Sequence, residues 1–162
     1  MQAITSRECF VNKKTISRLL CVQVMYAFIY RHPCYQLNLD LENDGKSHIL
    51  SIAEDIICLN SLGYLNDGDE KKMQFSVDFF NNLLHVLATN YQDIRGKMHQ
   101  VFQEKTTHVL RDALILVSVA ELIFYPDTTK NIIINDFLKI AKGFGVEQGV
   151  VELLNAVLER VR

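Results

Sequence analysis

Apolar residues recur at spacings of three and four along most of the chain, which predicts an all-helical protein. Proline and glycine are sparse, with 2 and 7 copies in 162 residues, and no Asn-Gly or Gly-Gly turn joins alternating runs. We expect a compact bundle of about seven helices. Their expected ranges are about 14–31, 47–59, 69–90, 92–102, 107–124, 132–142 and 147–161.

Several helix boundaries have sequence signals. Ser47, Asp69 and Thr107 are residues that commonly cap a helix N-terminus. Gly143 is a suitable terminator after Lys142. The three isoleucines within 131–135 could form a buried strand, but the apolar spacing downstream of them favours a helix.

The longest apolar run covers residues 19–30, where only Gln23 interrupts 12 positions. A membrane-spanning helix needs roughly 20 apolar residues. Arg31, His32 and Pro33 follow the run directly, and no small-residue cleavage site is present. We therefore expect a core helix in a soluble, cytoplasmic protein without a membrane segment.

Charge is distributed unevenly, although the net charge is only −2. Residues 1–33 carry five basic side chains and one acidic one, whereas residues 34–126 carry 7 basic and 13 acidic side chains. A basic start on an acidic body suggests two surfaces with different partners. An ordinary solvated helix start explains the pattern equally well.

The sequence offers little for catalysis or for metal binding. The four cysteines form no Cys-x-x-Cys pair, the histidines are scattered, and no glycine-rich phosphate loop follows a strand. We expect Cys21 and Cys58 to pack as small apolar residues. No cofactor and no metal site are predicted.

A few polar residues stand in apolar surroundings. His85 is expected in the core or at its rim, and Glu121 is expected to be buried and bound to a helix N-terminus or a basic partner. Asn135 and Asn155 are expected to tie helix ends or loops together, because a buried amide must find hydrogen-bond partners. We consider a catalytic role for the lone carboxylate of Glu121 the less probable alternative.

The start of the first helix combines cations with aromatic rings. Lys14 and Arg18 share a helix face, and Tyr26 and Tyr30 lie four residues apart. Cations neutralise phosphates, and aromatic rings stack on unpaired bases. The same residues could equally form a solvated helix surface.

Five segments in a consistent order resemble the NusB-type transcription antitermination factors. The first, RLLCVQVMY, is similar to the family's R-x-x-A-x-Q-A-L-Y signature, with Arg18, Gln23 and Tyr26 in register. The others are FSVDFFNNLLHVLATNYQDI, RDALILVSVAELIF, IIINDFLKIAKGFG and LLNAVLERV. The resemblance covers most of residues 13–162 and implies one domain of two packed helical subdomains, preceded by a flexible arm over 1–12.

The resemblance also implies a function without catalysis. Such factors bind boxA-type single-stranded RNA in ribosomal RNA transcripts. They do so with a small-subunit ribosomal protein, NusE, and join the RNA polymerase elongation complex. Carried over to this chain, the resemblance implies an RNA surface that includes Lys13, Lys14, Arg18, Gln23 and Tyr26. A homodimer is a further possibility, because some relatives form one.

Departures from the family pattern leave other functions open. The basic segment is thinner, with Thr15 and Ile16 inside it, and Leu116 and Ala120 replace an arginine and a tyrosine of the pattern. The alternative function is therefore a protein-interaction module of the same fold with weak or lost RNA binding. A ribosomal RNA methyltransferase with a NusB-like domain would need a long C-terminal extension after Arg162.

Overall fold

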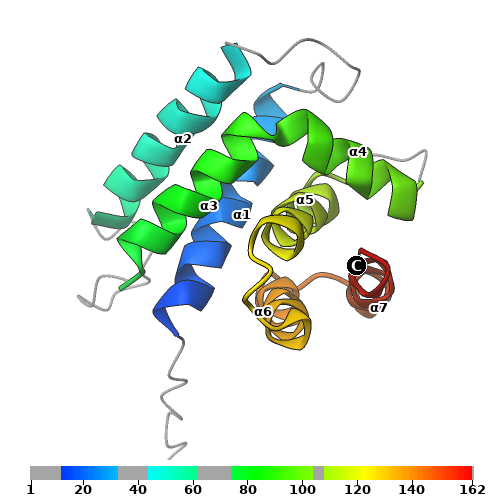
Figure 1. Ribbon diagram of the computed structural model, residues 1–162. Helices are drawn as coiled ribbons and strands as arrows, with labels where there is room; N and C mark the ends of the chain where they lie inside the picture. The colour runs from blue at the N-terminus through cyan, green and yellow to red at the C-terminus, as the bar shows by residue number, and fades with distance from the viewer. Residues whose placement is uncertain (1–11, 33–43, 62–73, 104–107, 162) are drawn as a thin grey trace, which may run out of the picture.

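The structure is a computed structural model that describes residues 12–32, 44–61, 74–103 and 108–161. This part of the chain contains seven helices and no strand, which confirms the predicted all-α fold (Figure 1). The helices are α1 (Lys13–Arg31), α2 (Asp44–Ser61), α3 (Val77–Thr89), α4 (Tyr91–Val101), α5 (Val109–Phe124), α6 (Lys130–Gly143) and α7 (Gln148–Glu159). The predicted arm over 1–12 lies outside the described residues except for Asn12.

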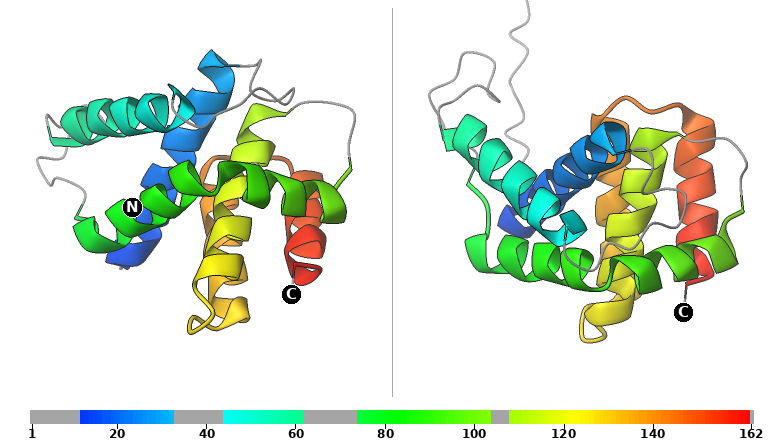
Figure 2. Two further views of the ribbon diagram at one scale, coloured as in Figure 1. Left: turned by 45° about the horizontal axis from the view of Figure 1, so that its top comes forward. Right: turned by 90° about the horizontal axis from the view of Figure 1, so that it is seen from above.

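The helices form two groups, which meet where α1 packs on α5. Helices α1, α2 and α3 pack on one another, and α5 packs against α4, α6 and α7. Helices α3 and α4 follow one another along one side of the molecule, while α5, α6 and α7 lie side by side (Figure 2). Because α1 contacts α5 and α6 as well as α2 and α3, it connects the two groups.

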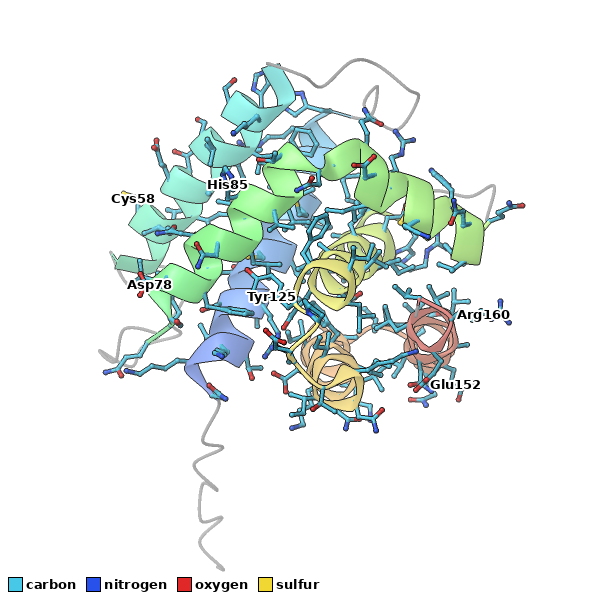
Figure 3. The ribbon with its side chains drawn as sticks, in the orientation of Figure 1. Cys58, Asp78, His85, Tyr125, Glu152 and Arg160 are labelled. Atoms are coloured by element: carbon cyan, nitrogen blue, oxygen red, sulfur yellow. The ribbon has the colours of Figure 1, made fainter. Side chains whose placement is uncertain are left out.

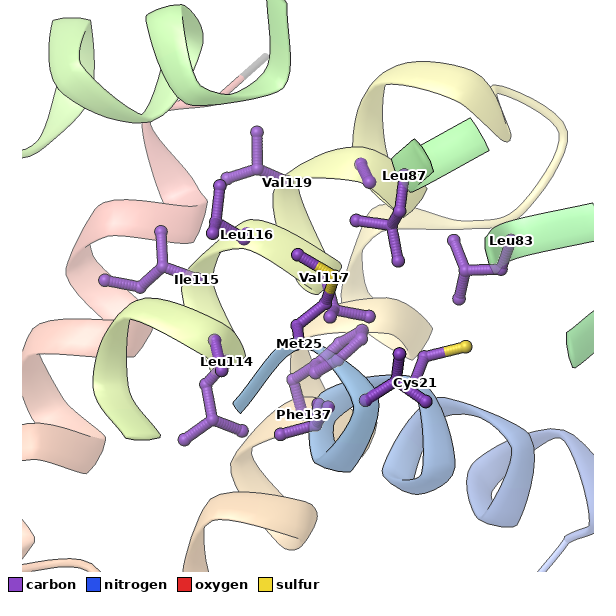
Figure 4. Close-up of a cluster of buried hydrophobic side chains, with 14 of the residues drawn as sticks. Cys21, Met25, Leu83, Leu87, Leu114, Ile115, Leu116, Val117, Val119 and Phe137 are labelled. Carbon is purple, nitrogen blue, oxygen red and sulfur yellow. The ribbon is translucent and has the colours of Figure 1, made fainter. Parts of the chain in front are cut away.

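The core is one continuous cluster, in which α1 and α5 are buried most deeply. Phe28 of α1, Phe80 of α3 and Phe137 of α6 are among the largest fully buried side chains. Figure 4 shows leucine, valine and isoleucine side chains of α5 meeting residues of α1, α3 and α6, including Met25. Close packing of these apolar side chains is the main favourable term in folding.

Helix α1 contains the long apolar run. It begins where the Asn12 side chain accepts a hydrogen bond from the backbone N–H of Lys14 at 3.0 Å, and it ends at Arg31, two residues before Pro33. Among the described helices, none is long and apolar enough to cross a membrane. Most apolar residues of the run are buried, so it forms a core helix, as predicted.

Two predicted helix starts differ from the structure. Helix α2 begins at Asp44, so Ser47 lies inside the helix instead of capping it. Helix α3 begins at Val77, after Ser76, because the backbone N–H of Ser76 donates to the Ser17 hydroxyl of α1 at 3.0 Å. The proposed caps Asp69 and Thr107 lie outside the described residues.

The other boundaries are close to the predictions. The His108 side chain caps α5 by accepting from the backbone N–H of Arg111 at 3.1 Å. The isoleucine-rich segment is helical in α6, as predicted. Gly143 is the last residue of α6, but Gly145 has the left-handed backbone, with φ of 69°.

Four residues that were predicted to be buried or to hold structure together are exposed: Cys58, His85, Asn135 and Asn155. Figure 3 labels Cys58 on α2 and His85 on α3. Apolar residues near each of these four residues in the same helix pack into the core, so the four side chains themselves face solvent. Cys21, in contrast, is fully buried, as predicted, and burial raises the pKa of its thiol well above the ordinary value.

Candidate nucleic-acid interface

The five residues predicted to contact RNA all lie on α1, but in different environments. Lys13 and Lys14 are exposed in the first helical turn. Arg18 is buried, Gln23 is half-buried, and Tyr26 is exposed. Three of the five predicted residues are therefore accessible to a ligand, one is partly accessible and one is not.

Arg18 is the centre of a buried ion-pair cluster. Its side chain is 3% exposed, and it donates through Nε and Nη2 to the two carboxylate oxygens of Glu121, at 2.8 and 2.5 Å. Its Nη1 donates to Oδ2 of Asp136 at 2.6 Å. This fork geometry is the strongest way for a protein to hold a carboxylate. It also confirms the prediction that a basic partner satisfies buried Glu121.

The charged form of Arg18 is strongly favoured by this cluster. Burial opposes the charge, but the hydrogen bonds and charges of Glu121 and Asp136 outweigh it and raise the pKa of the guanidinium. The Thr15 hydroxyl also donates to Asp136, at 2.6 Å. Because every strong contact of Arg18 is internal, the expectation that Arg18 presents its charge on the surface is corrected.

Lys14 and Arg18 do share a face of α1, as predicted, but that face turns toward α3. The Lys14 ammonium lies 5.5 Å from the ring centre of Phe79, and the Arg18 guanidinium lies 5.1 Å from it. Such cation–π contacts are favourable at these distances. Lys14 covers the edge of the core while its charge stays accessible.

Gln23 and Tyr26 lie beside a pocket between α1, α5 and the end of α6. Leu110 of α5 and Phe144, just after α6, complete its lining, and its volume is about 310 Å³. Mostly apolar walls with a few polar groups are typical of ligand pockets.

The Gln23 side chain carries a hydrogen-bond acceptor with no partner. Its Oε1 is buried and accepts no hydrogen bond among the described residues. A buried acceptor left without a donor costs about 1–3 kcal/mol. A ligand that brings a donor into the adjacent pocket, with a rotation of the amide, would recover that energy.

The structure places the cations and the pocket on different sides of α1. Lys14 and Gln23 are nine residues apart, or about two and a half helical turns, so they project in nearly opposite directions. A strand that contacts both must pass around the start of α1.

Sequence reasoning missed Leu110, Phe144 and Asp136 as neighbours of the predicted residues. Phe144 had a local signal, because it is an aromatic residue between Gly143 and Gly145, where a helix was expected to end. Leu110 and Asp136 had none, because only the packing of α5 and α6 on α1 brings them close.

A sequence model described as the NusB family matches residues 16–162. The matched segment contains all seven helices except the first residues of α1. This chain therefore belongs to the NusB family.

Curated relatives carry the same family name. Proteins called transcription antitermination protein NusB from Rickettsia rickettsii (strain Sheila Smith) and Rickettsia akari (strain Hartford) are 24% and 28% identical to this chain, over 159 and 161 residues. In both cases the alignment covers 93% of this chain and 92% of the relative. The chain thus matches these proteins over nearly their whole length.

Proposed function

We propose that this protein is a transcription antitermination factor that binds boxA-type single-stranded RNA of ribosomal RNA transcripts. It does so together with the ribosomal protein NusE, and the pair joins the RNA polymerase elongation complex in the cytoplasm. The observation that carries this proposal is the family match over residues 16–162. No catalytic step is part of the proposed function.

Two features of α1 support RNA as the ligand. Lys13 and Lys14 present cations at the start of the helix, where they can neutralise phosphates. Tyr26 presents a ring that is 41% exposed beside the pocket, where an unpaired base can stack. Gln23 supplies the polar group next to that ring.

Binding of a fluorescein-labelled boxA-type oligoribonucleotide, followed by anisotropy over a series of salt concentrations, tests this proposal. Lys13→Ala and Lys14→Ala should weaken binding and lower the slope of log K against log salt by roughly 0.7 each, as expected for one phosphate contact on a single strand. Lys97→Ala on α4, also an exposed lysine, is the matched control. Equal slopes for all variants would refute the proposed phosphate contacts.

The burial of Arg18 favours a second candidate function. With its charge neutralised internally, the described part of α1 offers fewer cations to RNA than its sequence contains. A protein-interaction module that binds the ribosomal protein without RNA fits this reduced charge. Affinity capture of this protein by NusE, with and without boxA RNA, separates the two candidates. RNA-enhanced capture supports antitermination through RNA, and capture that is indifferent to RNA supports the interaction module.

A further inference from the structure

Tyr30 is the most exposed large apolar side chain among the described residues, at 69%. It lies on α1 one helical turn after Tyr26, whose exposed fraction is 41%. The two rings are nearly parallel, with an angle of 7° between their planes and 6.2 Å between their centres. Two aligned aromatic rings therefore stand on the open side of α1.

The core does not explain this pair. The buried residues next to it, among them Met25, Phe28 and Ile29, occupy the other faces of α1. Single exposed apolar residues are ordinary, but adjacent aligned rings on a rigid helix form a patch suited to a flat partner. The two rings already lie against each other on a rigid helix, so the tyrosine side chains lose little conformational entropy when a partner stacks on them.

The charges around the pair favour an anionic partner over a basic or neutral one. Between Lys13 and Arg31, α1 contains basic residues and no acidic residue. Arg31 follows Tyr30 directly and is exposed. The carboxylates of Glu121 and Asp136 that contact α1 are both held by Arg18. Lys13 and Arg31 are exposed on one face at the two ends of α1, and the exposed rings lie between them along the helix axis, which suits a negatively charged strand with flat bases.

We propose that Tyr26 and Tyr30 form a stacking platform on which two successive unpaired bases of a single-stranded RNA lie. This inference rests on the proposed RNA-binding function and adds Tyr30 as a direct contact. From Lys13 to Tyr30 the helix extends about 25 Å, so the platform lengthens the RNA path from the first turn to the end of α1. Arg31 is then placed to meet the phosphate beyond the second base.

Tyr30→Ala, Tyr30→Phe and Tyr30→Trp in the full chain test the platform with the same labelled boxA-type oligoribonucleotide. Loss of one stacked base should weaken binding about fivefold or more, whereas Tyr30→Phe should keep most of the affinity. The slope of log K against log salt should stay unchanged in Tyr30→Ala, because no charge is removed. Leu59→Ala on α2, where the side chain is 43% exposed, is the matched control for removal of a surface apolar group.

The chain contains no tryptophan, so Tyr30→Trp introduces a single reporter. Its emission should be quenched when a base stacks on it, and an RNA with an abasic site at that position should restore it. Unchanged emission at saturating RNA, or wild-type affinity in Tyr30→Ala, overturns the proposal.

The double variant Tyr26→Ala/Tyr30→Ala separates direct stacking from support of Tyr26 by Tyr30. Independent stacking of two bases predicts that the fold-losses multiply. A double variant no weaker than Tyr26→Ala alone would mean that Tyr30 only positions Tyr26, and would overturn the second stacking contact.

Two further outcomes are distinguishable. If wild-type protein does not bind the RNA, the proposed function and the platform both fail. If Lys14→Ala weakens RNA binding and Tyr30→Ala does not, only the platform fails. Sedimentation of Tyr30→Ala checks for a second copy as the partner, because loss of a dimer with unchanged RNA affinity would assign the rings to a contact between copies and refute RNA stacking.

Discussion

The Arg18 guanidinium carries one positive charge and meets two carboxylates, so the buried cluster keeps one excess negative charge. The deeper carboxylate, Glu121, receives two hydrogen bonds and is 0% exposed. Asp136 is 14% exposed and also receives the Thr15 hydroxyl, so the excess charge lies where water and a second donor can stabilise it. Burial of these charges is therefore favourable only when the guanidinium and both carboxylates are present.

Arg18→Met should be strongly destabilising, by about 3–5 kcal/mol, because it leaves a buried carboxylate without its partner. Urea unfolding monitored by circular dichroism gives the free energy of unfolding. Lys97→Met removes an exposed lysine of α4 and should change that free energy by no more than about 0.5 kcal/mol. A small loss in Arg18→Met would contradict the structural role, and an RNA-binding defect in that variant is interpretable only after this measurement.

The sequence predicted the burial of a residue correctly where the local spacing of apolar residues determines it. It failed where contacts between distant helices determine it. The spacing of apolar residues located Cys21 in the core. The isolation of Glu121 among apolar residues predicted a helix N-terminus or a basic residue as its partner, and the structure shows the basic residue. Nothing in the sequence near Arg18 distinguished a surface cation from a buried one, because its partners are 103 and 118 residues away. The same distance hid Asp136 from sequence reasoning.

At the scale of elements, the end of α1 and the start of α2 meet through two histidines. The rings of His32 and His48 are 4.6 Å apart, and His32 also packs on Phe28. Burial, the neighbouring His48 and Arg31 lower the pKa of His32. The contact between α1 and α2 therefore favours the neutral imidazole.

A pH-dependent contribution to stability follows from the lowered pKa of His32. The unfolded chain binds a proton more readily than the folded one, so the free energy of unfolding is highest above the ordinary pKa of about 6.5 and falls as pH drops through the lowered value. His48→Gln should flatten this dependence and move the NMR titration of His32 toward its ordinary midpoint. His99→Gln, an exposed histidine of α4, is the control. A His32 titration that does not move in His48→Gln would contradict the coupling.

Helix boundaries show which signals the sequence contains. Pro33 marked the end of α1 locally, and that helix was predicted to within a residue, although the Asn12 cap at its start was not predicted. The start of α3 depends instead on Ser76 meeting Ser17, a contact between residues 59 positions apart. The side-chain caps Asn12 and His108 were not predicted either, so residue type alone did not locate these helix starts.

At the scale of the whole molecule, α1 connects the two helix groups. It packs on α2 and α3 in one group and on α5 and α6 in the other, and the core is continuous between them. The amphipathic patterns predicted this fold class well, because seven helices with apolar stripes must bury them on one another. The sequence did not predict which helix would be central. Apolar periodicity shows which face of a helix is buried, but not which other helix packs against that face.

Thermal unfolding should therefore occur in a single transition, with coincident curves from far-ultraviolet circular dichroism and tyrosine near-ultraviolet signals. Phe28→Ala in α1 should shift both curves together, since Phe28 is fully buried in the shared helix. Two separated transitions, or a shift confined to one probe, would show that the groups unfold independently.

The separation in sequence between Arg18 and its carboxylate partners also affects the order in which the helices can pack while the chain is being synthesised. Arg18 is synthesised early, whereas Glu121 in α5 and Asp136 in α6 follow 103 and 118 residues later. Until Glu121 is made, burial of α1 would enclose an uncompensated cation. The bidentate partner of Arg18 lies in α5, so we expect α1 to finish packing only after α5 has been synthesised.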